Sequence, residues 1–173
     1  SRMMAAAWPH RAVFLTPMAA VAGAVADEVL AALTEGSDLA RAYVNNGGDI
    51  AFHLAPGESL RAGMVGDYHM PAIDGMATLG FDRPVRGIAT SGWKGRSFSL
   101  GIADSVTVLA KNAAAADVAA TLIANAVDID HPAVQRAAAR SLDPDSDLGG
   151  RPVTVAVGAL DPASVATALD RGR

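Results

Sequence analysis

The chain of 173 residues has no cysteine, which excludes disulfides, thiol catalysis and cysteine-bound zinc. This composition fits a reducing compartment, and we expect a cytoplasmic protein. Aromatic residues are also scarce, at 5% of a chain that is 51% apolar. The sequence therefore predicts a core of small aliphatic side chains, in a chain long enough for one well-buried domain.

Long apolar runs and clustered positive charge are missing as well. The most apolar stretch, residues 18–32, is interrupted by Gly23, Asp27 and Glu28 and falls short of the ~18 uninterrupted residues typical of a spanning helix. The net charge is −4, and the 14 Lys and Arg residues are scattered. A basic stripe of the kind that binds nucleic acid is thus absent. We expect neither a membrane nor a nucleic acid as partner.

Helix signals occur in four places. Thr16 followed by Pro17 predicts a helix start, with an apolar face formed by Val21, Ala24, Val25, Val29 and Leu33. That helix should run from Pro17 to about Leu33. The other three predicted helices span residues 113–127, 134–140 and 163–169, the last of them capped by Asp161 and Pro162.

Strand patterns fill much of the rest. Residues 41–54, 103–110 and 151–157 alternate as strands do, and residues 56–86 are rich in Gly, Pro and Asp and predict turns and short strands. We therefore expect an α+β domain with a mostly antiparallel sheet and helices on one face. A parallel α/β fold is the alternative. Helix followed by strand occurs in both halves, which is compatible with a loose internal duplication.

One helix carries a pair of oxygen-bearing side chains. Asp117 and Thr121 are spaced i and i+4 and so share a face of the helix that begins near Ala113. Such a pair suits a hard cation that takes its remaining ligands from phosphate and water. The alternative is structural, because an Asp near a helix N-terminus is favoured by the helix dipole and a Thr can bond to a preceding carbonyl.

Two turn motifs offer backbone access to a ligand. Thr90-Ser91-Gly92 combines hydroxyl groups with a glycine, and Asn46-Gly47-Gly48-Asp49 interrupts a strand. An Asn-Gly pair is in itself typical of a hairpin turn.

Other polar groups have simpler interpretations. His53 and His69 have no partner at metal-ligand spacing, and His131 is followed by Pro132, which predicts a helix start rather than a metal cluster. Residues 142–150 are acidic but lack the spacing of a calcium loop, so they predict a turn before a strand. The basic turn at residues 93–96 fits a surface hairpin and a ring-and-phosphate contact about equally.

Several motifs together resemble a known family. The order of a TSG turn at residues 90–92, a valine-rich strand at 103–110 and A-D-x-x-x-T at 116–121 is similar to the closing half of the ApbE-like flavin transferases. The UPF0280 family within that superfamily is closer still. The segments that resemble it are PMAAVAGA at 17–24, NGGDI at 46–50, SFSLGIAD at 97–104 and DSDLG at 145–149.

The resemblance implies a T-fold-like ApbE architecture over residues 1–173, with strands at the N-terminal side of the family domain missing. It also implies a nucleotide ligand, FAD, and Mg²⁺, because ApbE-like enzymes transfer FMN from FAD to a protein threonine. The implied metal ligands are Asp117 and Thr121. The implied cofactor-binding residues are Gly23, Asp27, Asn46, Gly47, Gly48, Asp49, Thr90, Ser91 and Gly92.

The sequence also departs from the transferase pattern. Ala22 stands where the K-G-x-x-x-D segment of the transferases has lysine, although Gly23 and Asp27 keep its Gly and Asp. Residues 97–104 lack the His, Pro and Gly of the H-x-x-D-P-x-T-G motif. Catalytic residues are thus not assigned. A non-catalytic oligomeric scaffold and an enzyme acting on another phosphorylated small molecule remain as alternatives, and a sheet of this kind is compatible with a homo-oligomer.

Overall fold

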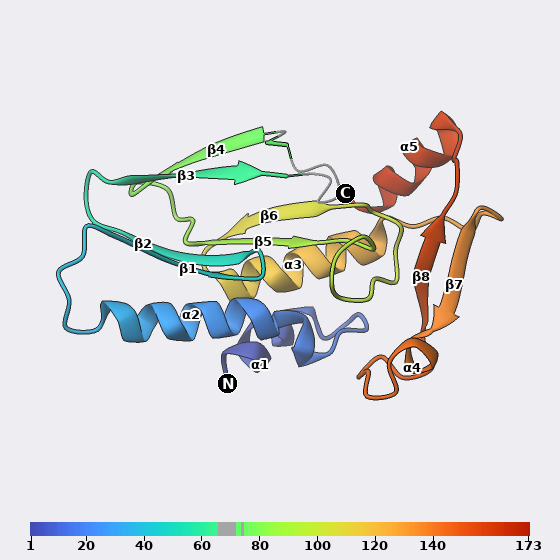
Figure 1. Ribbon diagram of the computed structural model, residues 1–173, viewed down its shortest axis with the longest axis horizontal. Coiled ribbons are helices and arrows are strands. Elements are labelled where there is room, and N and C mark those ends of the chain that lie inside the picture. The colour runs from blue at the N-terminus through green and yellow to red at the C-terminus, as the bar shows by residue number, and fades with distance from the viewer. Residues whose placement is uncertain (66–71, 74) are drawn as a thin grey trace. The chain divides into compact units, whose positions relative to one another are not determined.

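The computed structural model describes residues 1–65, 72–73 and 75–173. His69 and part of the turn-rich segment 56–86 lie outside these residues. The chain forms two compact units. The first unit comprises Ser1–Thr90 and Thr107–Ala119, and the second comprises Ser91–Val106 and Ala120–Arg173. Figure 1 shows the elements of both.

The first unit contains a helical N-terminal part. Its short helices are α1 (Arg2–Ala7), η1 (Trp8–His10) and η2 (Pro17–Ala20), and they precede α2 (Val21–Thr34). The predicted helix start at Pro17 is confirmed, but its first turn is a 3₁₀ turn. The unit also holds the start of α3 (Ala113–Ala126), close to its predicted bounds.

The sheet of the first unit has the strand order β1-β2-β5-β6. These strands are β1 (Arg41–Asn46), β2 (Asp49–Leu54), β5 (Gly87–Ser91) and β6 (Val106–Ala110). The pairs β1–β2 and β2–β5 are antiparallel. Strands β3 (Ser59–Met64) and β4 (Gly75–Gly80) form a separate antiparallel hairpin. Only the last residue of β5 and the first residue of β6 belong to the second unit.

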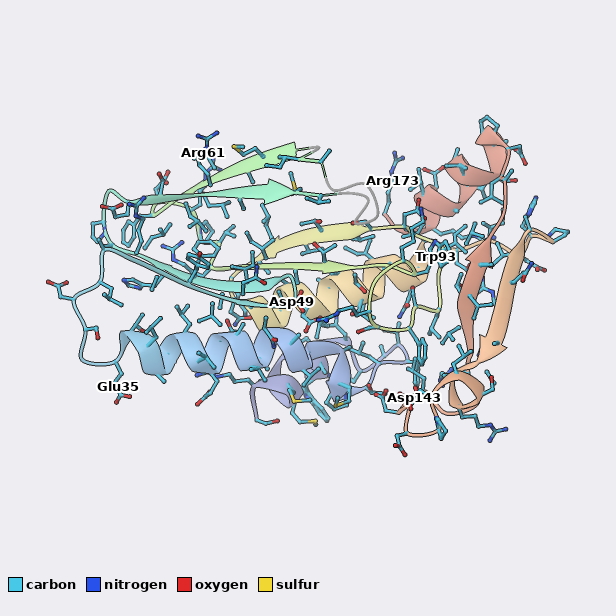
Figure 2. All side chains as sticks on the ribbon, viewed as in Figure 1. Glu35, Asp49, Arg61, Trp93, Asp143 and Arg173 are labelled. Atoms are coloured by element: carbon cyan, nitrogen blue, oxygen red, sulfur yellow. The ribbon has the colours of Figure 1, made fainter. Side chains whose placement is uncertain are left out.

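Residues of β2 alternate between two different cores, as neighbouring strand residues point to opposite faces. Phe52 and Leu54 pack with Leu79 of β4 and Ile88 of β5. Ala51 packs instead with alanines of α2 and α3. Asp49 is two residues before Ala51, so its side chain lies on the helix-covered face. Figure 2 shows Asp49 between the sheet and α2.

The buried face of α2 differs from the predicted one. Val25, Val29 and Leu33 are each nearly half exposed, whereas Gly23, Ala24 and Ala26 are buried. Small residues are selected on the inner face because helix and sheet backbones approach closely there. Among the described residues, one helical segment, Pro17–Thr34, is long and apolar enough to cross a membrane. Core helices of soluble proteins and signal sequences have the same length and composition.

The second unit contains the end of α3 and a second hairpin. Its remaining elements are β7 (Val134–Ala138), α4 (Ala139–Leu142), β8 (Pro152–Val157) and α5 (Pro162–Arg171). Strands β7 and β8 are antiparallel, with an irregularity between Gln135 and Arg136. The core of the unit joins residues of the 91–106 segment, α3 and α5: Ile102, Ala103, Ala124, Val127, Ile129 and Ala168.

Two local predictions in this unit are wrong and two are confirmed. Residues 134–138 form a strand rather than a helix because they pair with β8, and Pro132 accordingly does not begin a helix. The predicted turn before the 152–157 strand is present. Asp161 caps α5 by accepting from the backbone N–H groups of Ala163 and Ser164. The expected α+β class with mostly antiparallel pairing is confirmed.

Candidate cation site

Helices α2 and α3 cap each other within the first unit. Both carboxylate oxygens of Asp27, on α2, accept backbone N–H bonds from the first turn of α3, 3.0 Å from Ala113 N and 2.9 Å from Ala114 N. In return, Asp117 of α3 accepts from the backbone N–H of Gly23 at 3.0 Å, in the first turn of α2. Each carboxylate thereby satisfies amides that a helix N-terminus leaves unpaired.

Glycine is required where the two helices meet. A Cβ atom on Gly23 would collide with the carbonyl group of Ala113. The close approach brings the start of α2 within hydrogen-bonding distance of Asp117. Gly23, a sequence-predicted ligand residue, therefore has a packing function in this unit.

The β1–β2 hairpin brings a second carboxylate to the same region. Gly47 and Gly48 have φ angles of 70° and 112°, which the two-residue turn requires and which other residues rarely adopt. Asn46 donates from Nδ2 to the carbonyl oxygen of Ala22 at 3.1 Å and so ties the hairpin to the start of α2. Asp49, which follows the turn, is only 9% exposed and accepts from the backbone N–H of Thr90 at 3.3 Å.

Asp49 and Asp117 are close enough for their charges to interact. The pKa of Asp117 is raised to about 7, mainly by burial and also by the negative charge of Asp49. The N–H groups of Gly23 and Ala22 oppose this rise. Burial raises the pKa of Asp49 to about 6, against the opposing effect of the Thr90 N–H. Each of the two carboxyl groups is thus harder to ionise than an ordinary aspartate.

Capping alone does not account for this pair. A capping carboxylate at α2 gains nothing from a second buried acid beside it, since like charges at low dielectric repel. In the part of the chain that the structure describes, no Lys or Arg forms an ion pair with Asp49 or Asp117. A bound cation would neutralise both carboxylates, and oxygen ligands of this kind suit Mg²⁺.

The protein side of such a site is incomplete by itself. Over the described ranges, no group of three or more His, Asp or Glu side chains is arranged to hold a metal ion. Mg²⁺ commonly takes one or two carboxylates from the protein and its other ligands from phosphate and water. The donor set therefore fits a magnesium ion that arrives with a phosphorylated ligand.

The other predicted site residues are placed in different ways. Thr90 offers its N–H to Asp49, whereas its hydroxyl lies 2.9 Å from that of Thr107. Ser91, Gly92 and Thr121 belong to the second unit. There, Gly92 has no room for a Cβ atom because the Asp104 carbonyl group lies against it. Asp27 is engaged in capping α3, as described above.

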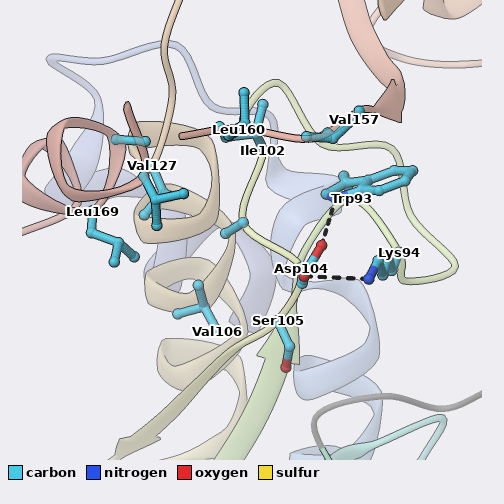
Figure 3. Close-up of a pocket in the computed structure, with 14 residues that line it drawn as sticks. Trp93, Lys94, Ile102, Asp104, Ser105, Val106, Val127, Val157, Leu160 and Leu169 are labelled. Atoms are coloured by element: carbon cyan, nitrogen blue, oxygen red, sulfur yellow. Dashed lines mark hydrogen bonds and ion pairs between the residues drawn. The ribbon is translucent and has the colours of Figure 1, made fainter. Parts of the chain in front are cut away.

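The second unit has a cavity that sequence reasoning did not find. It measures about 490 Å³ and is lined on one side by Trp93, Lys94 and Asp104 (Figure 3). In the basic turn at 93–96, Gly95 and Arg96 are exposed, whereas Trp93 and Lys94 are partly buried and line this cavity.

Comparison with known proteins gives the family. A family model described as "AbpE bacteria" matches residues 1–173, and similar curated proteins are named UPF0280 protein. The chain belongs to the UPF0280 family of ApbE-related proteins. The resemblance read from the sequence motifs is thereby confirmed.

Relatives named UPF0280 protein match most of this chain. The protein of Methanopyrus kandleri is 41% identical over 136 residues, which is 76% of this chain and 52% of the relative. That of Methanothermobacter thermautotrophicus is 37% identical over 153 residues, or 82% of this chain and 54% of the relative. The chain thus spans about half the length of the curated relatives it matches. No solved structure matches it significantly.

Proposed function

We propose that this UPF0280 protein binds a flavin nucleotide, FAD, together with a divalent cation, Mg²⁺. The observation that carries the proposal is the pair of interacting carboxylates, the buried Asp49 and the partly buried Asp117, in the absence of an ion-paired Lys or Arg among the described residues. Asp49 and Asp117 would hold the cation. The pyrophosphate oxygens of the nucleotide would supply further ligands.

The chain's own residues would prepare this site in two ways. The Asn46 bond to Ala22 and the Asp117 bond to Gly23 hold the hairpin and both helices in fixed positions, so little ordering is left for the moment of binding. The burial of Asp49 and the partial burial of Asp117 lower the local dielectric and so strengthen the attraction of the two carboxylates for a cation. A bound Mg²⁺ would neutralise charge on the pyrophosphate, the contribution that metal ions make to phosphoryl transfer.

FMN transfer is the reaction that the ApbE relationship suggests for this site. Residues 97–104 lack the His, Pro and Gly of the H-x-x-D-P-x-T-G motif of the transferases. Nucleotide binding therefore does not imply FMN transfer in this chain. We therefore propose nucleotide binding as the primary function and leave the acceptor group unassigned.

A fluorescence titration tests the proposal. FAD is added to the native chain in EDTA and in Mg²⁺, and flavin emission is followed; we expect binding at tens of micromolar, a common small-ligand range, only with Mg²⁺. Asp117→Asn keeps an oxygen for the α2 cap but loses the charge, and it should weaken the Mg²⁺-dependent binding about tenfold or more. Asp145→Asn, at an exposed acid, is the matched control.

The outcomes separate the classes of function. An unchanged response to Mg²⁺ in Asp117→Asn would remove Asp117 from the site. Failure of the native chain to bind FAD at any Mg²⁺ concentration would favour the scaffold, for which light scattering would then show a homo-oligomer. Mass spectrometry of ligands that co-purify with the native protein would identify another phosphorylated compound, should FAD be the wrong nucleotide.

A further inference from the structure

The cavity of the second unit has the size and lining of a small-molecule pocket. Its volume of about 490 Å³ lies within the range of roughly 300–1,000 Å³ that is common for such sites. Most of its wall is aliphatic. The aliphatic lining side chains include Ile102, Val106, Val127, Val157, Leu160 and Val165.

One side of this cavity is polar and aromatic. The Trp93 indole donates from Nε1 to Asp104 Oδ1 at 2.9 Å, and Lys94 Nζ lies 3.3 Å from Asp104 Oδ2. The same ammonium nitrogen is 5.9 Å from the centroid of the Trp93 ring. Figure 3 shows these three side chains together, with Val127 and Leu169 on the opposite side.

The backbone fixes this polar edge before any ligand arrives. Trp93 N donates to the carbonyl oxygen of Ala103 at 2.9 Å, which joins the two ends of the intervening segment. Gly92 packs against the backbone of Asp104 so closely that a Cβ atom would not fit. A pre-organised edge reduces the entropy lost on binding.

We propose that the cavity binds an uncharged, planar heterocycle whose edge carries adjacent N–H and C=O groups, as an amide or imide does. The Lys94 ammonium group has three N–H donors, of which the ion pair uses one, and the Asp104 carboxylate has more acceptor positions than its two bonds occupy. A donor and an acceptor side by side match a C=O next to an N–H. The aliphatic wall accommodates the ring, and Trp93 supplies an aromatic surface.

Charge favours a neutral ligand. An anion would meet the carboxylate of Asp104 and a cation the ammonium group of Lys94, whereas a neutral edge can bond to both partners of the ion pair. The rival explanation is structural: the Trp93–Asp104–Lys94 contacts would only tie the 93–104 segment together. In that case, altering them would change stability without changing which ring is bound.

Quinazoline-2,4-dione is a suitable probe because it has two fused rings and an imide edge, and naphthalene is its apolar match. The chain has two tryptophans, Trp8 and Trp93, so a Trp8→Phe background leaves Trp93 as the only indole reporter. We expect the dione to change Trp93 emission saturably, and naphthalene to bind at least fivefold more weakly. Lys94→Met and Asp104→Asn should each weaken binding of the dione about tenfold and leave binding of naphthalene unchanged. Thermal unfolding of each variant, measured in parallel, shows whether the substitution also changes stability.

Filling the cavity provides a second test. Val165, which lines the cavity, and Val155, which does not, are both 40% exposed, so Phe can be introduced at either without burying it in a full core. Val165→Phe should abolish dione binding and Val155→Phe should not. Equal affinity for dione and naphthalene, no saturable binding by the native chain, or an equal effect of both Phe substitutions would overturn the proposal.

This inference is independent of the proposed nucleotide site. The dione carries no phosphate, so Asp117→Asn should bind it as the native chain does, with or without Mg²⁺. If the native chain bound the dione but not FAD, the proposed nucleotide site would be refuted and the cavity proposal would stand.

Discussion

The raised pKa of Asp117 makes the stability of the ligand-free protein depend on pH. The pKa rises from 3.8 to about 7 on folding, so the folded state holds a proton that the unfolded state has released. A raised folded-state pKa stabilises the protein fully below the unfolded value, and this contribution is lost as the pH rises through the folded value. The stabilisation that Asp117 contributes is therefore lost between about pH 4 and about pH 7.

The size of the effect follows from the two pKa values. With one pKa unit equal to about 1.4 kcal/mol, the linkage relation gives a loss of about 2.5 kcal/mol from this group between pH 5 and pH 8. The side chain of Asp49, whose pKa is also raised, adds to the same trend. Asp117→Asn removes the ionisation but keeps an oxygen that can accept the Gly23 N–H.

Urea unfolding in EDTA at pH 5, 6, 7 and 8 measures this contribution. The free energy of unfolding should fall with pH in the native chain, and the fall should be smaller by about 2.5 kcal/mol in Asp117→Asn. Asp145→Asn should follow the native curve. Millimolar Mg²⁺ should reduce the fall in the native chain and in Asp145→Asn but not in Asp117→Asn, because a bound cation stabilises the ionised pair.

The reasoning is refuted if the native chain and Asp117→Asn have parallel stability curves between pH 5 and pH 8. Such a result would mean that Asp117 is ionised in the folded state at ordinary pH, without the repulsion and burial described above. Asp117→Ala distinguishes the charge from the cap, since it removes both and should destabilise the protein at pH 5, where Asp117→Asn should not.

Two further predictions concern the junction of α2 and α3. Gly23→Ala should lower the free energy of unfolding by about 1–3 kcal/mol, because the new methyl group meets Ala113, whereas Gly63→Ala, which meets only ordinary contacts, should cost less than about 1 kcal/mol. Asp27→Ala should cost about 0.5–2 kcal/mol through loss of the α3 cap. Chemical denaturation measures both. If Asp27→Ala left stability unchanged but weakened FAD binding, Asp27 would be a ligand residue rather than a cap.

The sequence by itself determined the elements with strong local signals. Thr16-Pro17 gave a helix start, Asp161-Pro162 gave a helix cap, and the Asn-Gly-Gly-Asp turn joined two strands, because each of these depends on backbone preferences within a few residues. Family motifs were likewise readable from the chain alone.

Only the tertiary structure decided which faces are buried and which acids meet. Residues 134–138 form a strand because they pair with β8. On α2, Val25, Val29 and Leu33 face outward, whereas Gly23, Ala24 and Ala26 are buried where the helix packs closely. The pairing of Asp49 with Asp117 joins residues 68 positions apart in sequence, and no local pattern encodes such a distance. The physical reason is that burial and repulsion between charges depend on three-dimensional separation, whereas periodicity and capping depend on neighbours along the chain.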